Sequence, residues 1–460
     1  MTDISSDREA RGESDQLAHV TIVGGGITGL TAAWDLSSRR PDLVIDVHES
    51  TGSWGGKLKQ SVIGSSGEID EGADAFLARV PEGTELCREL GMEGTLVSPA
   101  TSHAYVWSRG QLRSLPTGVV LGVPTSIAAL RRSGVVPWAG VARAACEPLM
   151  ARRASKKVDT DSIGEVITSR FGHHVTQRLV DPLLGGINAG NADFLSLAAS
   201  APQLLATASS PRSMMRALRS VQRPDGPVFF SPTGGMAQIA EKLVDQLGQR
   251  GVGLHLRSPI SQISGPTIVA TPAFAAANLL ATVAPQTAQQ LRAVEYVSVA
   301  LVTIEVLRSS ISHALDGSGF LVPRVTGTLL TACSWSSTKW AHIGNRSADT
   351  VIMRLSAGRL GDRRVDDFDD DRLVTLMLAE LRPMIGMTGD PGTVRVSRWH
   401  KGFPQYFPGH LGRITALEST LAHEAPHIQM AGAAYRGVGV PACIRSGRRA
   451  SGEMVAWLDR

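Results

Sequence analysis

A phosphate-binding turn is indicated near the start of the chain by the spacing of Gly24, Gly26 and Gly29. Glycine lets the backbone come close to a pyrophosphate, and the helix expected from Ile27 and Thr28 onward presents free N–H groups to it. Glu49 follows about 25 residues after the first glycine, where a carboxylate can hold the two hydroxyls of a ribose. The pattern therefore predicts a dinucleotide-binding site.

A second pair of glycines favours a flavin nucleotide over a nicotinamide one. Gly55 and Gly56, followed by the basic residue Lys57, stand just after the ribose carboxylate. This arrangement resembles the flavin branch of the dinucleotide-binding fold, and NAD enzymes do not usually have it. The pair alone would be an ordinary turn, but after Glu49 it predicts FAD.

Another glycine-rich turn lies near the C-terminus. A strand expected at 428–431 leads into a turn that contains Gly432, Val438, Gly439 and Val440. Pro441 is well placed to begin a helix, and a helix N-terminus stabilises negative charge. Reduced flavin carries such charge on the N1/C2 carbonyl side, so we expect the first turn to hold the pyrophosphate and this one the ring. A structural strand-turn-helix is the alternative.

These turns need strands before them and helices after them, and the hydrophobic pattern supplies both. β-branched residues predict strands at 19–23 and 43–48. Met236 opens a helical repeat of apolar residues, and we expect its side chain in the core rather than against the cofactor. Strands predicted at 252–256 and 267–270 then return the chain to the nucleotide-binding domain.

Two other regions have different patterns. Residues 80–205 are predicted to be helical, with a capping box formed by Ser162 and Glu165. The glycine-dense stretch 181–191 is predicted to be a loop that closely approaches a ligand or another element. Residues 290–405 are rich in strand patterns and predict one antiparallel sheet.

The composition narrows the class of protein. The 460 residues allow two or three domains, and the net charge of +4 fits an anionic ligand. No dense basic block with interleaved aromatic residues indicates nucleic-acid binding. The four cysteines lie far apart without a C-x-x-C pair, and the twelve histidines show no ligand spacing. We therefore predict no metal site and a reducing, cytoplasmic location.

Two segments bear on contact with membranes. The polar residues 1–17 predict a disordered tail rather than a signal peptide. No apolar run reaches the roughly 18 residues of a transmembrane helix. The apolar stretch 115–130 is interrupted by prolines and glycines. Core packing is the simpler interpretation of it, and a ligand entrance or a weak peripheral membrane contact is the alternative.

Longer motifs resemble the flavin-dependent porphyrinogen oxidases of haem biosynthesis, from about residue 18 to the end. They include the segment 178–190, and the most specific of them are its part 182–190 and Pro404-Gln405-Tyr406. Others are found at 72–79, 234–236, 337–342 and 437–441. The resemblance is strongest to the bacterial branch that oxidises coproporphyrinogen III to coproporphyrin III.

This resemblance implies an α/β fold with α+β elements, organised as three discontinuous domains. A Rossmann-like FAD-binding domain of the amine oxidase and protoporphyrinogen oxidase type is expected at 18–82, 228–288 and 418–460. A mainly helical domain is expected at 83–205. A sheet-based substrate-binding domain is expected at 206–227 and 289–417.

The resemblance also suggests residues for the site. Further contacts with FAD are expected at Ser50, Gly72, Ala73, Ile260 and Thr271. The acidic substrate needs cations and pocket walls, expected at Arg79, Lys339, Tyr406 and Tyr435, with Arg354 as a weaker candidate. The motifs depart from the family at Ala73, Val80 and Ala341, where some relatives have proline, lysine and proline. These departures leave the anchoring of the propionates open.

The implied reaction removes six electrons in three two-electron steps, with oxygen as the acceptor and one hydrogen peroxide per step. We hypothesise that hydride leaves a meso carbon for flavin N5 while protons leave ring nitrogens. The product is aromatic, so no strong general base is required. The alternatives are oxidation of protoporphyrinogen IX, a flavin amine oxidase or carotenoid desaturase, and a non-catalytic protein that only binds flavin and porphyrin. The chain is expected to be a monomer or a homodimer.

Overall fold

A parallel sheet forms the centre of the nucleotide-binding end of the molecule. The computed structural model describes residues 18–64, 66–150, 161–220 and 226–460, so the tail predicted at 1–17 lies outside the described residues. The sheet has five parallel strands in the order β10 (Gly253–His255), β2 (Val44–His48), β1 (His19–Val23), β11 (Thr267–Val269) and β17 (Ile428–Met430). The predicted strands, and their return to one sheet from distant parts of the chain, are confirmed.

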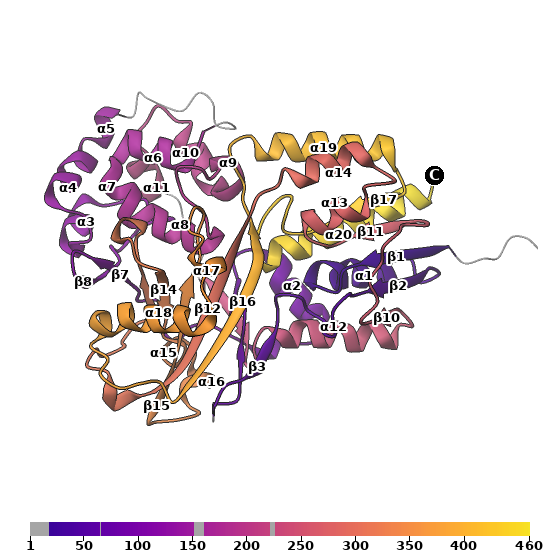
Figure 1. Cartoon of the computed structure of the whole chain (residues 1–460). Coiled ribbons are helices and arrows are strands. Elements are labelled where there is room, and N and C mark those ends of the chain that lie inside the picture. The colour runs from indigo at the N-terminus through magenta and orange to yellow at the C-terminus, as the bar shows by residue number, and fades with distance from the viewer. Residues whose placement is uncertain (1–17, 65, 151–160, 221–225) are drawn as a thin grey trace, which may run out of the picture.

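Helices cover both faces of this sheet (Figure 1). One face packs against α1 (Ile27–Arg39), α2 (Pro81–Glu89), α12 (Ala237–Gln249) and α20 (Val440–Leu458). The other face packs against α13 (Ala273–Leu279), α14 (Pro285–Arg292) and α19 (His410–Glu424). Met236 is fully buried in the first of these cores, as predicted. Cover on both faces explains why the strands read as continuous apolar runs.

The second sheet has seven strands and occupies the middle of the molecule. Its order is β16 (Thr393–Pro404), β12 (Tyr296–Leu307), β15 (Thr350–Ala357), β14 (Leu330–Ser334), β13 (Gly319–Leu321), β7 (Tyr105–Ser108) and β8 (Gln111–Ser114). Neighbouring strands are antiparallel except β13 and β7, which are parallel. The predicted strands of this sheet are confirmed, and the β7–β8 hairpin joins it from a segment that was expected to be mainly helical. Helix α18 (Asp370–Ile385) packs against the sheet.

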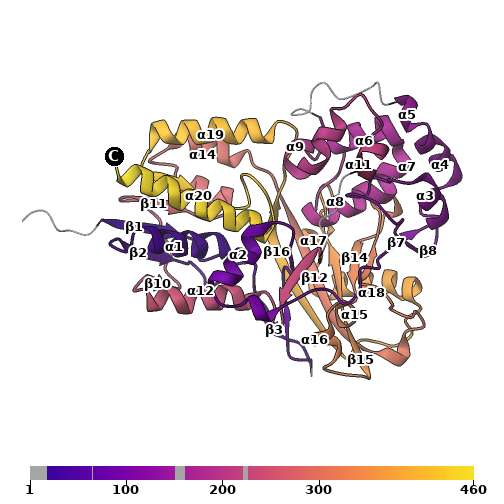
Figure 2. The same cartoon turned by 180° about the vertical axis from the view of Figure 1, so that it is seen from behind.

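A separate hydrophobic core holds a group of helices at the opposite end from the five-stranded sheet (Figure 2). The predicted capping box opens α6 (Ile163–Phe171), because the side chains of Ser162 and Glu165 each accept a hydrogen bond from the other's backbone N–H at 3.1 Å. The helices are α3 (Ile127–Ser133), α4 (Trp138–Ala145), α5 (Glu147–Met150), α6 (Ile163–Phe171), α7 (His173–Val175), α8 (Asp181–Asn188), α9 (Leu197–Ser200), α10 (Leu205–Ala208) and α11 (Met214–Ser220). Helix α11 packs here, although 206–227 was expected with the substrate sheet.

The prediction of a loop at 181–191 is wrong for most of this stretch, because residues 181–188 form α8. A π-helical turn, η2 (Thr176–Val180), runs directly into it, and Pro182 is tolerated in a first helical turn. Leu184 is buried in the helical core, and this packing outweighs the low helix propensity of Gly185 and Gly186.

Short elements connect the two sheets. Strands β3 (Gln60–Val62) and β4 (Glu68–Asp70) form a hairpin, and β5 (Phe76–Leu77), β9 (Phe229–Pro232) and β6 (Leu96–Val97) form a small sheet. The remaining elements are single turns: η1 (Glu93–Thr95), η3 (Pro202–Leu204), η4 (Arg308–Ser310), η5 (Arg324–Thr326), α15 (Ser336–Lys339), α16 (Ala341–Gly344) and α17 (Arg364–Asp367). The β3–β4 hairpin follows the Gly55-Gly56 turn and docks on the seven-stranded sheet through Arg395, whose guanidinium donates to the carbonyls of Ser61 and Asp70.

Candidate active site

The first glycine turn is fixed by the carboxylate of Glu49. Its Oε2 accepts the N–H of Gly25 at 2.8 Å, and its Oε1 accepts the N–H of Thr51 at 2.8 Å. The N–H of Gly55 donates to the carbonyl of Gly25 at 2.9 Å, which places the second glycine pair against the first turn. The structure therefore brings the turn, the ribose carboxylate and the flavin-type glycine pair together.

Two glycines of the first turn have opposite surroundings. A Cβ on Gly29 would lie well inside contact distance of the Gly24 carbonyl oxygen, so this glycine is required by close packing of helix on strand. A Cβ on Gly26 would meet nothing within 4 Å. Gly26 is also the N-cap of α1, and no side chain caps that helix. The open N-terminus fits a pyrophosphate, which would accept its N–H groups.

The second glycine turn has the same open character. Gly439 is the N-cap of α20 with a φ of 100°, no side chain caps this helix, and a Cβ on Gly439 would meet nothing within 4 Å. Helices α1 and α20 lie against each other, since a Cβ on Gly447 would clash with the carbonyl of Thr28. Two helices of 13 and 19 residues thus present uncapped N-termini at the same edge of the sheet.

The other predicted cofactor residues surround these turns. Thr271 follows β11 beside Gly24, and its hydroxyl is buried without a hydrogen-bond partner, as expected for a group that a ligand would satisfy. A Cβ on Gly72 would clash with the carbonyl of Lys57, so these two segments touch. The segment that leads to Ile260 reaches the first turn through the N–H of Ser258, which donates to the carbonyl of Glu49. The remaining predicted positions differ in exposure: Ser50 and Gly56 are exposed, Ala73, Ile260 and Val438 are half-buried, and Gly432 and Val440 are buried. These residues fit a dinucleotide and stay predictions as individual contacts.

A charged cluster joins the segment after Gly72 to the seven-stranded sheet. One oxygen of Asp74 lies 2.8 Å from Lys339 Nζ and 3.3 Å from Arg354 Nη2, and it also accepts the indole N–H of Trp340. Burial raises the pKa of Asp74, but the charges of Lys339 and Arg354 outweigh it and hold that pKa well below the usual range. Two cations share one carboxylate, so the cluster has a surplus positive charge.

Asp70 lies beside this cluster, and its pKa is shifted in the opposite direction from that of Asp74. Its Oδ1 accepts the backbone N–H of Met236 at 3.0 Å, which caps the turn before α12. Burial raises the pKa of Asp70 to about 7, against the opposing charge of Arg354. Asp74 lies within the motif 72–79, but the sequence predicts no role for either aspartate, because their partners lie more than 160 residues away.

The predicted substrate residues fall in three different environments. Arg79 is exposed just after β5. Lys339 is engaged with Asp74. Tyr406 and Tyr435 are only 2% and 1% exposed, so in this conformation neither ring presents a surface to a ligand. Their place differs from the predicted pocket wall. They pack beneath the second glycine turn, together with His410, for which the sequence predicts no role.

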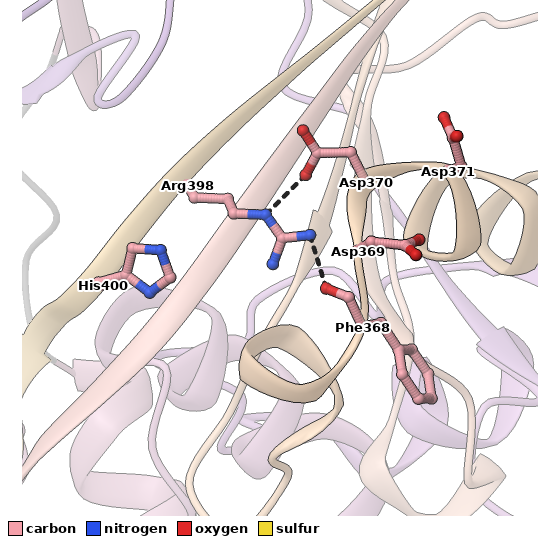
Figure 3. Close-up of a pocket in the computed structure, with 6 residues that line it drawn as sticks. All are labelled: Phe368, Asp369, Asp370, Asp371, Arg398 and His400. Carbon is pink, nitrogen blue, oxygen red and sulfur yellow. Dashed lines mark hydrogen bonds and ion pairs between the residues drawn. The ribbon is translucent and has the colours of Figure 1, made fainter.

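A pocket of about 560 Å³ lies away from all of these residues, at the start of α18. Figure 3 shows its lining, where Arg398 donates to the carboxylate of Asp370 at 2.7 Å and to the carbonyl of Phe368 at 2.8 Å. Asp369 and Asp371 add further negative charge. An acidic lining repels an acidic substrate, so this pocket does not fit the predicted site.

The described parts of the chain contain neither a metal-ligand cluster nor a membrane-spanning helix. Within them, no group of three or more histidine, cysteine or acidic side chains could hold a metal ion. Among the same residues, no helix combines the length and the apolar character needed to cross a bilayer. The arrangement seen is instead that of a dinucleotide site beside a cationic cluster.

Comparisons with known proteins agree with this geometry. The model of the flavin containing amine oxidoreductase family matches residues 27–455. Coproporphyrinogen III oxidase of Bacillus subtilis is 32% identical, with 97% of this chain and 99% of that protein covered. The Mycobacterium leprae protein of the same name is 33% identical over 95% and 98%. A crystal structure titled putative protoporphyrinogen oxidase, from Exiguobacterium, superposes with a TM-score of 0.84 at 29% identity, covering 96% and 99%.

Proposed function

Because the chain belongs to the flavin-containing amine oxidoreductases and, within them, to the coproporphyrinogen III oxidases, we propose that it oxidises coproporphyrinogen III to coproporphyrin III. FAD is the cofactor, and the chain is an oxidoreductase. Oxygen would be the electron acceptor and hydrogen peroxide the by-product. Six hydrogen atoms leave the macrocycle, and three oxygen molecules become three hydrogen peroxide molecules, so atoms and electrons balance.

The observation that supports the proposal most strongly is the convergence of the two uncapped helix N-termini at Gly26 and Gly439. When bound there, FAD supplies a two-electron acceptor for hydride from carbon. The N-terminus of α1 would neutralise the pyrophosphate, and that of α20 would stabilise negative charge on the flavin ring. Glu49 would hold the ribose while keeping the first turn closed.

The surplus charge beside Asp74 supports binding of an acidic substrate. Lys339 and Arg354 both lie at the junction between the FAD segment and the seven-stranded sheet. A propionate arriving there would meet two cations that share the Asp74 carboxylate, with the neighbouring Asp70 neutral below about pH 7. Arg79 is exposed and remains our candidate for a direct contact with a propionate.

Porphyrin fluorescence provides the test. FAD-loaded protein is mixed with coproporphyrinogen III in air, and the coproporphyrin emission and the released peroxide are followed. We expect a rate well above that of protein stripped of FAD, with about three peroxides per porphyrin if the stoichiometry of the reaction holds. The stripped protein is the necessary control, because porphyrinogens also oxidise without an enzyme.

Two outcomes would overturn the proposal. A rate equal to that of stripped protein would indicate a protein that only binds flavin and porphyrin. Faster turnover of protoporphyrinogen IX, compared at equal concentration, would move the assignment to the alternative substrate. The Arabidopsis relative named protoporphyrinogen oxidase 2 is 24% identical, lower than the bacterial coproporphyrinogen oxidases named above.

We also propose that the enzyme works in the cytoplasm. The four cysteines are free thiols, Cys87, Cys146, Cys333 and Cys443. Unpaired cysteines are typical of proteins in a reducing compartment. A monomeric or homodimeric state and a weak membrane contact near 115–130 stay predictions.

A further inference from the structure

The second glycine turn is held from outside by two aromatic side chains that precede and open α19. The hydroxyl of Tyr406 accepts the N–H of Gly437 at 2.9 Å and donates to the carbonyl of Ala433. The ring of His410 stacks on Tyr406 with centroids 4.0 Å apart and planes 19° apart. Its Nε2 lies 2.8 Å from the carbonyl of Tyr435, to which it donates. Together, Tyr406 and His410 bind the backbone of the turn at Ala433, Tyr435 and Gly437. We call this pair of side chains the clamp.

Both groups are neutral, which suits this task. Burial raises the pKa of Tyr406 and lowers the pKa of His410 to about 4. At neutral pH the phenol therefore keeps its proton and serves as donor and acceptor at once, and the imidazole is uncharged with one N–H. The clamp holds the turn without adding a charge next to the flavin ring.

The turn needs such support because its own conformation is unusual. Gly437 and Gly439 have φ values of 142° and 100°, which residues other than glycine rarely adopt. Glycine gains the most freedom when it is released, so a turn of this kind stays ordered only when other groups bind its peptide units. Tyr406 and His410 supply these bonds at three successive points, Ala433, Tyr435 and Gly437.

The backbone around Tyr406 is itself anchored in the substrate-side regions. The carbonyl of Tyr406 accepts the N–H of Ser196 at 2.7 Å. The side-chain NH₂ group of Gln405 donates at 3.0 Å to the carbonyl of Asn188, at the end of α8. The N–H of Gln405 donates to the carbonyl of Glu295, just before β12, at 2.8 Å. The clamp therefore connects the helical core and the seven-stranded sheet to the turn.

We propose that Tyr406 and His410 are positioning residues that fix the N-terminus of α20 against the flavin ring and so raise the reduction potential of bound FAD. The proposal rests on the proposed use of FAD. An aligned helix N-terminus favours the reduced, negatively charged ring over the oxidised one. When the clamp is loosened, that preference falls, while Arg79 and Lys339, the predicted substrate contacts outside this turn, stay in place.

The test is Tyr406→Phe, which removes only the hydroxyl. We expect FAD to stay bound and its two-electron midpoint potential, measured by stepwise reduction against a reference dye, to fall by about 30 mV, the equivalent of tenfold in relative affinity. The kcat should drop and the KM for porphyrinogen should stay unchanged. Tyr105→Phe is the matched control: its hydroxyl donates to Asp316 at 2.6 Å in another part of the molecule. It should leave the potential unchanged.

A second variant, His410→Gln, tests the same proposal in case Tyr406→Phe folds poorly. His410→Gln keeps a side-chain N–H that can donate to the Tyr435 carbonyl but loses the stacked ring, and it should lower the potential by a smaller amount. The proposal is overturned when FAD-loaded Tyr406→Phe and His410→Gln both keep the wild-type potential. The measurement uses no porphyrinogen, so a failed substrate assignment would leave the shift intact. Wild-type protein that binds no FAD would overturn both proposals.

Discussion

The two glycine turns that we propose to hold FAD are built in different ways. The first is closed by the charged side chain of Glu49, which accepts the N–H of Gly25. Glu49 follows Gly25 by 24 residues and stands at the end of the neighbouring strand β2. The second is closed by the neutral side chains of Tyr406 and His410, from a segment that also contacts the helical core and the central sheet. The side chain that closes the first turn therefore comes from the same strand-helix-strand unit, and the side chains that close the second come from a segment anchored in two other regions.

This difference separates two properties of a flavoenzyme. Changes at the first turn should decide whether FAD binds. Changes at the second should decide how readily the bound FAD accepts electrons. Changes in the helical core or the central sheet should affect this property as well, because both contact the segment that closes the second turn. Five variants, one of them a matched control, break or sharpen this distinction.

Gly29→Ala should have the largest effect. The new methyl group would collide with the carbonyl of Gly24, so α1 must move away from β1. We expect a loss of about 3 kcal/mol in the free energy of unfolding and no retained FAD, measured by thermal unfolding and by flavin absorbance of the purified protein.

Gly26→Ala is the matched control for that variant. Its φ of −74° suits alanine, and its methyl group would meet no protein atom within 4 Å. FAD-free protein should unfold like wild type, whereas the affinity for FAD should fall. Wild-type affinity in Gly26→Ala would show that the pyrophosphate lies elsewhere.

Glu49→Gln should have the next largest effect. The amide can accept one of the two N–H groups that the carboxylate accepts now, and it turns an NH₂ group toward the other. Losing a buried hydrogen bond to a charged group costs about 1.5–3 kcal/mol, so FAD should bind roughly 10- to 100-fold more weakly. Fluorescence titration with FAD measures this. A large shift in potential with unchanged affinity would contradict the division between the turns.

Asp70→Asn tests the hairpin that connects the first turn to the central sheet. Because the pKa of Asp70 is raised to about 7, the folded protein holds more protons than the unfolded chain between about pH 4 and 7, and stability falls as the pH rises through that window. Asparagine can still accept the N–H of Met236 and carries no charge. Above pH 8 the variant should be more stable by on the order of 1–3 kcal/mol, with FAD affinity unchanged. Chemical denaturation at several pH values measures this, and parallel curves for the two proteins would refute it.

Arg436→Met should have the smallest effect. Arg436 belongs to the second turn, but its guanidinium is paired with Glu418 at the surface, where such pairs contribute about 0–1 kcal/mol. Stability and flavin potential should both stay close to wild type. A lowered potential here would show that surface charge, rather than Tyr406 and His410, orders the turn.

The parts of the molecule that could be predicted from sequence are those with local patterns. The strand, turn and helix around Gly24, the carboxylate at Glu49 and the helix after Gly439 follow from spacing alone, because each is formed by residues close in sequence. Helix α8 was missed because Gly185 and Gly186 disfavour a helix in isolation, and only its burial against distant helices stabilises it.

Long-range partners escaped prediction for a related reason. Asp74 and Lys339 are 265 residues apart, and no periodicity connects them. Tyr406 was recognised within a motif, but its type suited a pocket wall as well as a clamp. Only the positions of Gly437 and Ala433 around its hydroxyl distinguish the two roles.

The contact between α1 and α20 has a consequence for biosynthesis. Gly447 packs against Thr28 so closely that a methyl group would not fit, although the two residues lie near opposite ends of the chain. A ribosome makes the first glycine turn long before the second. The nascent chain therefore cannot form the contact between α1 and α20 until α20 has been synthesised, so the two turns come together only after the intervening domains have had time to fold.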